Sequence, residues 1–164
     1  MNQPKIRESG IINVEFGENV TVVNPVNLYG CAVGSNVFIG PFVEIQKDVK
    51  IGDCTKIQSH SFICELVDIG KDCFIGHGVM FINDLFAIDG PARGDKSLWK
   101  QTKIGDNVSI GSNATILPVT VCSNVVIGAG SVVTIDIKIA GVYAGNPARL
   151  IKTIEMAPGN RTAG

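Results

Sequence analysis

The most regular feature of the chain is an aliphatic residue that recurs every six positions, in many cases followed by glycine. One register holds Val33-Gly34, Ile39-Gly40, Ile51-Gly52, Ile69-Gly70 and Ile75-Gly76, with Ile45, Ile57 and Ile63 at the steps between them. The register resumes at Ile104, Ile110 and Ile116, slips by one residue at Pro118-Val119, and continues through Val121, Ile127 and Val133. A weaker form precedes it at Phe16, Val22 and Leu28. A strand has a period of two and a helix of 3.6, so a period of six predicts short strands joined by tight corners.

A second position of each hexad carries small or β-branched side chains. These are Val37, Val43, Val49, Thr55, Ser61, Val67, Cys73 and Val79. Because at least fourteen hexads follow this pattern, we predict a solenoid in which the aliphatic residues point inward and stack coil on coil.

Composition supports an all-β chain. Val and Ile together number 40 against 6 Leu, and 19 of 164 residues are Gly, which favours strands and turns over helices. With 45% hydrophobic and 18% charged residues the chain is not expected to be disordered. A net charge of −1 gives no electrostatic footprint for nucleic acid.

The sequence lacks the features of membrane-spanning, exported and disulfide-bonded proteins. No apolar run approaches the length that a membrane-spanning helix needs, so we expect no such helix and no membrane partner. Residues 1–10 contain no apolar signal region, so we expect a cytoplasmic protein. The five cysteines include no CxxC pair, and we expect them to be reduced and mostly buried.

The repeat, together with Ala144-Gly145-Asn146-Pro147-Ala148-Arg149 near its end, resembles the hexapeptide-repeat acyltransferases. The resemblance covers residues 11–150 of a single domain, 1–164. It implies a left-handed parallel β-helix in which three hexads close one coil, so that each residue stacks on its equivalent three hexads later. It also implies acetyl-coenzyme A as co-substrate, no metal, and a homotrimer. After the β-helix we expect a short helix around Leu150 to Met156 and a tail, over residues 151–164.

The period is absent between Asn83 and Thr102, which predicts an inserted loop over 84–102. A structureless loop this long is usually either functional or disordered, and this one carries the only Trp together with Arg93, Lys96 and Lys100. In trimeric members of the resembled family an equivalent loop leaves one subunit and covers the active-site cleft at its neighbour.

Two stretches, 56–63 and 74–84, resemble a subfamily that N-acetylates nucleotide-linked 3-amino sugars. The resemblance implies transfer of acetyl to the amine of a dTDP- or UDP-linked sugar, for cell-surface polysaccharide biosynthesis such as that of O-antigen. In that subfamily the Asn-Asp pair, here Asn83-Asp84, precedes a Pro-Arg. Ala87-Ile88 stands there instead, and Arg93 is the candidate substitute for a substrate contact.

Stacking at three-hexad intervals locates a candidate site. His77 lies under Ser59, and Asn83 lies near Glu65. We expect His60, His77, Asn83 and Asp84 to line one edge of the prism, with Gln58 beside them. His77, Asn83 and Asp84 are the candidate catalytic residues, with His77 acting either as general base or as a group that orients the amine. Gln58, His60, Glu65 and Arg93 are the candidate substrate contacts.

Coenzyme A is expected in a groove between subunits, against the later coils. The candidate contacts are Gly111, Ala129 and Gly130 for the pantetheine arm and Arg149 and Lys152 for the phosphates.

Three alternatives compete with this interpretation. A γ-class carbonic anhydrase needs three zinc-binding histidines, and the chain has two His. A serine or maltose O-acetyltransferase would also use a histidine, although the Asn83-Asp84 pair fits the amino-sugar group better. A non-enzymatic β-helix scaffold remains as a hypothesis of a different class.

Overall fold

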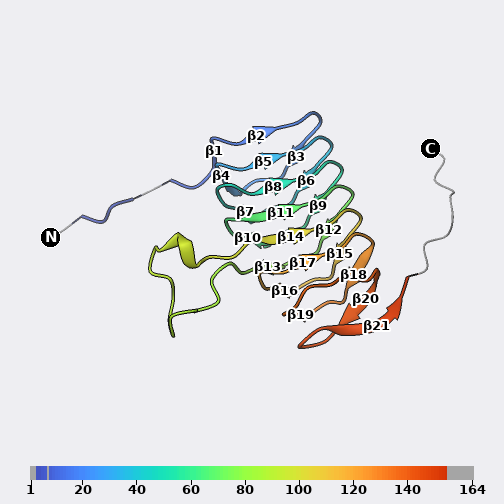
Figure 1. Cartoon of the computed structure of the whole chain (residues 1–164). Helices are drawn as coiled ribbons and strands as arrows, with labels where there is room; N and C mark the ends of the chain where they lie inside the picture. Colours follow the sequence, from blue (N-terminus) through green and yellow to red (C-terminus); the bar gives the residue numbers. More distant parts are fainter. Residues whose placement is uncertain (1–2, 7, 155–164) are drawn as a thin grey trace.

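The chain winds into a stack of short parallel strands that form three sheets (Figure 1). The computed structural model describes residues 3–6 and 8–154. Strands follow one another from sheet A to sheet B to sheet C and back to sheet A, so that each round of the chain makes one coil. The predicted β-helix of hexapeptide repeats is confirmed.

The strands are mostly two residues long. Sheet A holds β1 (Ile11–Ile12), β4 (Asn27–Tyr29), β7 (Glu44–Ile45), β10 (Phe62–Ile63), β13 (Met80–Phe81), β16 (Thr115–Ile116) and β19 (Val132–Val133). Sheet B holds β2 (Glu15–Phe16), β5 (Ala32–Val33), β8 (Lys50–Ile51), β11 (Val67–Ile69), β14 (Thr102–Ile104) and β17 (Thr120–Val121). Sheet C holds β3 (Thr21–Val22), β6 (Phe38–Ile39), β9 (Lys56–Ile57), β12 (Phe74–Ile75), β15 (Ser109–Ile110), β18 (Val125–Ile127), β20 (Gly141–Ala144) and β21 (Arg149–Thr153).

The inward positions are those that the six-residue period selects. Ile39, Ile57, Ile75 and Ile110 follow one another through sheet C, each at 0% exposure. The small-residue position is buried too, and its polar members are satisfied: the Ser61 hydroxyl donates to the carbonyl of Gly76, and the Thr55 hydroxyl to that of Gly70. The core therefore consists of aligned columns of β-branched side chains, each packed against its equivalents in neighbouring coils.

The spacing between stacked residues shows where the repeat is regular. Thr55 and Cys73, in neighbouring coils, are 18 apart in sequence, whereas Lys71 and Asp106, also in neighbouring coils, are 35 apart. The loop that follows β13 accounts for the difference, and the stack continues on its far side. After Pro118 the spacing becomes 17, as between Asn107 and Asn124, which is the predicted slip.

The carboxy-terminal element corrects one prediction. Residues 149–153 form strand β21, which pairs antiparallel with β20, where a short helix was expected around Leu150 to Met156. The hairpin gives the last strand of sheet C a hydrogen-bonded partner. Residues 155–164, which include the rest of the expected tail, lie outside the described residues.

Among the residues that the structure describes, no helix is both long and apolar enough to cross a membrane. The only helical segment that they include is the 3₁₀ turn η1 (Lys96–Leu98), which lies in the inserted loop.

Candidate functional site

The candidate residues lie at two different corners of the prism. We call the turn from sheet C to sheet A the C–A corner, which includes residues 40–43, 58–61, 76–79, 111–114 and 128–131. The turn from sheet A to sheet B is the A–B corner, which includes residues 46–49, 64–66 and the loop 82–101. His60 and His77 are at the C–A corner, whereas Asn83, Asp84 and Glu65 are at the A–B corner, across the width of sheet A.

This arrangement corrects the expectation of a single edge. A step of three hexads moves one coil along the same corner, but a step of one hexad moves to the next corner. His77 and Asn83 are one hexad apart, so strand β13 separates them. Gln58 lies beside His60 as expected, and Asn83 lies at Glu65 as expected.

At the C–A corner His77 is exposed and oriented by the coil before it. Its Nδ1 lies 2.9 Å from the hydroxyl oxygen of Ser59, the residue on which it stacks. The tautomer of the ring decides which of the two donates. If Nδ1–H donates to Ser59, the Nε2 lone pair is left available to accept a proton, as a general base requires.

His60, one coil before His77, has a different environment. Its ring stacks on Phe42 with a centroid distance of 4.8 Å and an interplanar angle of 28°. Phe42 was not among the residues predicted from the sequence, although its three-hexad spacing from His60 was a signal for this contact.

At the A–B corner the two residues that open the loop have structural contacts. The side-chain amide of Asn83 donates to the carbonyl oxygen of Glu65 at 3.2 Å, and the Asn83 carbonyl accepts from the amide of Lys100 at 2.9 Å. The Asp84 carboxylate accepts from the amides of Phe86 at 2.9 Å and Ala92 at 2.7 Å. Asp84 therefore shapes the first half of the loop.

The second half of the loop is joined to the coils by an ion pair. Lys96 Nζ lies 2.5 Å from Glu65 Oε2 and 5.1 Å from the centre of the Trp99 ring. The Asp95 carboxylate caps η1 by accepting from the amide and hydroxyl of Ser97, and these bonds lower the pKa of Asp95. These contacts were not foreseen from the sequence, since they join residues that no repeat relates.

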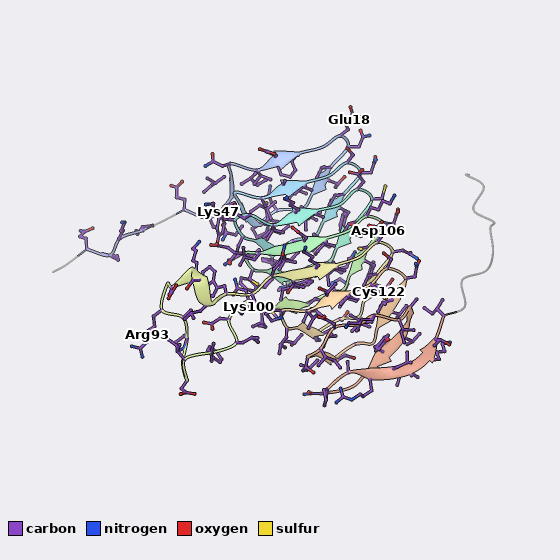
Figure 2. All side chains as sticks on the ribbon, in the orientation of Figure 1. Glu18, Lys47, Arg93, Lys100, Asp106 and Cys122 are labelled. Carbon is purple, nitrogen blue, oxygen red and sulfur yellow. The ribbon has the colours of Figure 1, made fainter. Side chains whose placement is uncertain are left out.

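Arg93 lies on the outer part of the loop, away from the stack, whereas Lys100 lies at the loop's base (Figure 2). Arg93 has a left-handed φ of 50° and is exposed. The structure therefore does not bring Arg93 to His77 within one chain.

A group of hydrogen-bonded polar side chains crosses the outer face of sheet A from the C–A corner to the A–B corner. Glu44 accepts from the amide of Asn27 at 3.1 Å and from that of Gln46 at 2.9 Å, and Gln46 in turn accepts from the Glu65 backbone at 3.3 Å. Burial raises the pKa of Tyr29, and the carboxylates of Glu44 and Glu65 raise it further.

The candidate coenzyme residues continue the C–A corner toward the carboxy terminus. Gly111 and the exposed pair Ala129 and Gly130 follow His77 along this corner. Arg149 begins β21 just after the turn whose Gly145 amide donates to Ser131, and Lys152 lies farther along the same strand. His60, His77, Gly111, Ala129 and Gly130 thus share one edge, and Arg149 lies near its end.

Comparison with known proteins agrees with this architecture. A family model described as the bacterial transferase hexapeptide (six repeats) matches residues 30–65, and one described as the hexapeptide repeat of succinyl-transferase matches residues 101–134. A maltose O-acetyltransferase from Clostridium difficile is 30% identical, with 89% of this chain and 72% of that chain covered and a TM-score of 0.56. The chain belongs to the hexapeptide-repeat transferases.

Two further proteins resemble this chain. A variant of AntD, an N-acyltransferase from Bacillus cereus, solved with dTDP and coenzyme A, has a TM-score of 0.75 at 22% identity and covers 88% of this chain and 86% of its own. The bifunctional protein GlmU of Clostridium beijerinckii is 33% identical over 143 residues, 84% of this chain. The hexapeptide-repeat transferase described here spans only 28% of the length of that GlmU.

The described part of the chain contains no group of three or more His, Cys, Asp or Glu side chains positioned to hold a metal ion.

Proposed function

We propose that this protein transfers acetyl from acetyl-coenzyme A to the amino group of a nucleotide-linked sugar, a dTDP- or UDP-linked 3-amino sugar in particular. The observation that carries the proposal is the exposed His77, oriented by Ser59 at 2.9 Å on an edge that continues into the candidate coenzyme residues. The likeness to AntD, which was solved with dTDP and coenzyme A, supports a nucleotide-linked acceptor.

The chemistry needs a neutral amine at the thioester carbonyl. The amine nitrogen forms a bond to the carbonyl carbon, and the resulting oxyanion requires a hydrogen-bond donor. The amine proton passes to His77 Nε2, the carbon–sulfur bond breaks, and coenzyme A leaves as a thiol after taking up a proton. This base role requires the tautomer in which Nδ1–H donates to Ser59.

The residues of the later coils have the chemical properties that binding of coenzyme A requires. Gly130 has open space where a side chain would begin, since a Cβ built there meets no atom within 4 Å, and this leaves backbone groups accessible to a pantetheine arm. Arg149 and Lys152 on β21 are exposed cations suited to phosphates. Bound there, acetyl-coenzyme A would supply the acetyl thioester near His77.

The position of the loop supports a homotrimer with sites between subunits. His77 and Asn83 lie at opposite corners of sheet A, and the loop stands off its own stack (Figure 1). A site that uses His77 together with Asn83, Asp84 or Arg93 therefore requires two copies, and a closed cyclic assembly completes every such site.

The direct test is coenzyme A release with a panel of acceptors: dTDP- and UDP-linked 3-amino and 4-amino sugars, free amino sugars, maltose and serine. We expect turnover with the nucleotide-linked amines. Loss of a general base typically costs ~10²–10⁴-fold, so His77→Asn should lower kcat by that factor with little change in KM. A loss below tenfold would limit His77 to orienting the amine.

The pH profile separates the two ionising groups. Wild-type kcat/KM should fall toward acidic pH, because a general base must be unprotonated and the attacking amine must be neutral. A fall that persists unchanged in His77→Asn would belong to the amine alone.

Subunit complementation tests the shared site. His77→Asn and Asn83→Ala trimers, each of low activity, are unfolded together and refolded as a mixture. If His77 of one copy works with Asn83 of the next, mixed trimers regain activity. No regain, with mixed trimers verified by mass spectrometry, would mean that His77 and Asn83 do not meet in a site between subunits.

The second candidate is sugar O-acetyl transfer, favoured by the 30% identity to the maltose O-acetyltransferase. Turnover with maltose but not with any amino sugar would establish it. A protein that binds no coenzyme A and transfers no acetyl would instead be a scaffold.

A further inference from the structure

One column of residues at the C–A corner has unusual side chains for its backbone conformation. In successive coils the left-handed position is occupied by Phe42, His60, Gly78, Asn113 and Gly130, with φ between 58° and 68°. Glycine and asparagine tolerate this conformation, whereas a bulky residue such as phenylalanine is an outlier there. The corresponding column at the corner from sheet B to sheet C is mostly Asn and Asp: Asn19, Asn36, Cys54, Asp72, Asn107 and Asn124.

Burial does not account for the aromatic pair. Phe42 is 56% exposed, and His60, on which it stacks, is also exposed. Strained, exposed residues are a reason to look for function, and this pair lies on the edge that carries His77.

Phe42 also borders a cavity. This cavity of about 230 Å³ is open to the surface and is lined by Ser9 and by residues of two adjacent coils, Pro25, Val26 and Asn27 of the first and Phe42, Val43 and Glu44 of the second. His60 belongs to the coil after Phe42, whereas Pro25 and Asn27, which line the cavity, belong to the coil before it. A flat ring in the cavity would extend the stack of Phe42 and His60.

The polar groups of the cavity match the edge of a pyrimidine-2,4-dione. Asn27 and Gln46 each donate one hydrogen bond to Glu44, one to each carboxylate oxygen. A carboxylate has about four lone-pair sites, so Glu44 can still accept from a ring N–H. Uracil and thymine present such an N–H between two carbonyl groups, whereas cytosine has an unprotonated nitrogen at that position.

The cavity also lies at a suitable distance from His77. The coil of Pro25 is three coils before that of His77, since Asn27 pairs with Glu44, Glu44 with Phe62, and Phe62 with Met80. At ~4.8 Å per coil this is ~14 Å, the scale of an extended nucleoside diphosphate between its base and the sugar that it carries. Coenzyme A would approach His77 from the opposite, carboxy-terminal side.

We propose that the nucleobase of the acceptor, a uracil or thymine, stacks on Phe42 in this cavity and donates its ring N–H to Glu44. This inference rests on the proposed function and names the part of the protein that recognises the nucleotide.

Titration calorimetry with UDP, dTDP and CDP, in the absence of acetyl-coenzyme A, tests the site without catalysis. Stacking of a base on an aromatic residue is typically lost in alanine variants with a roughly 5- to 100-fold weaker affinity. We expect that loss for UDP and dTDP in Phe42→Ala, and retained binding in Phe42→Trp, which keeps an aromatic face. Phe16→Ala removes another exposed phenylalanine, 41% exposed in β2, and should bind like wild type.

The Glu44→Gln variant tests the hydrogen bond. Wild type should prefer UDP to CDP, and a glutamine, which can donate to the unprotonated nitrogen of cytosine, should reduce that preference. Circular dichroism and melting temperature verify that each variant is folded.

Two results overturn the inference. One is a folded Phe42→Ala protein that binds UDP and dTDP within twofold of wild type. The other is an unchanged KM for the nucleotide-linked sugar in Phe42→Ala; since wild type would be active in that assay, this result would leave the proposed function intact. Failure of wild type to bind any nucleotide, with acetyl transfer only to free sugars, would overturn both.

Discussion

The coils and the loop over residues 82–101 are stabilised in different ways. In the coils, buried columns such as Ile39, Ile57, Ile75 and Ile110 repeat the same contact, and backbone hydrogen bonds join each strand to its neighbours. In the loop, all of which the structure describes, Ala92 is the only buried side chain. The loop is positioned instead by the Asp84 carboxylate, the bond from the Lys100 amide to Asn83, and the Lys96–Glu65 ion pair.

This difference means that the coils, and not the loop, account for most of the stability of the fold. Apolar burial supplies most of the folding free energy, so the coils can hold the edge that carries His77 without any contribution from the loop. The loop consists of a few specific polar contacts, so its sequence can change with little cost to the fold.

The largest expected effect is in the core. Ile75→Asp places an unpaired charge at a position with 0% exposure, which costs several kcal/mol or more, comparable to the ~5–15 kcal/mol margin of a domain. We expect no folded protein by circular dichroism, whereas Ile75→Val should fold with a loss of about 1 kcal/mol. A soluble Ile75→Asp protein with full β-structure would contradict the assigned core register.

A smaller, local effect is expected from Asp84→Ala. The variant loses the two hydrogen bonds that the carboxylate accepts from Phe86 and Ala92, each typically worth about 1.5–3 kcal/mol when one group is charged. Limited proteolysis should cut the loop faster while the melting temperature of the coils changes little. The matched control is Asp89→Asn, which neutralises an exposed carboxylate of the same loop and suits its left-handed φ of 55°. A large drop in melting temperature would mean that the loop stabilises the coils.

A smaller effect still is expected from Lys96→Met. The Lys96 side chain is 56% exposed, and exposed ion pairs contribute about 0–1 kcal/mol and weaken with salt. Loop cleavage should rise modestly at low ionic strength, and the difference from wild type should shrink at high ionic strength. Exchange of the two charges, Glu65→Lys with Lys96→Glu, should restore part of the protection. A salt-independent difference would assign the effect to packing of Lys96 on Trp99.

The smallest change is expected in thiol reactivity at neutral pH, which reports on the coils alone. Burial raises the pKa of Cys64 to about 12 and that of Cys31 to about 11, so both remain protonated and protected, while Cys54 is exposed. Alkylation followed by mass spectrometry should label Cys54 first, in wild type and in Asp84→Ala alike.

Because folding raises the pKa values of Cys31 and Cys64 above the usual ~8.5, the coils should lose stability as pH rises from that value through about 11 to 12.

The repeat made the coils predictable from the sequence. Each hexad identifies its own inward residue, and the pattern repeats over many hexads. A local exception such as the slip at Pro118 therefore does not change which residues are assigned to the core. The position of Asn83 next to Glu65 followed from the same three-hexad step.

The expectation that His77 and Asn83 line one edge of the same prism was wrong for a geometric reason that the sequence already contained. One hexad advances the chain from one corner to the next, so residues one hexad apart cannot share an edge. The contacts within the loop are a different case, because Lys96 and Glu65 are 31 apart in sequence with no periodic relation, and only the folded loop brings them together.

The carboxy-terminal strand shows the limit of local propensity. Leu150 favours helix and Ile151 and Thr153 favour strand, so residues 149–153 have no decisive preference. Pairing with β20, a contact between separate segments, selects the strand.

The chain added between β13 and β14 has the length of one coil. Lys71 and Asp106, which stack across it, are 35 apart in sequence, while stacked residues elsewhere are 17 or 18 apart. The added segment lies outside the prism, and the chain then returns to it in the same register, since Phe81 and Ile116 pair in neighbouring strands. Lengthening a loop costs little conformational entropy, so this corner is a natural insertion point. A segment of one coil's length can therefore be added or removed at this corner while the coils on either side keep their register.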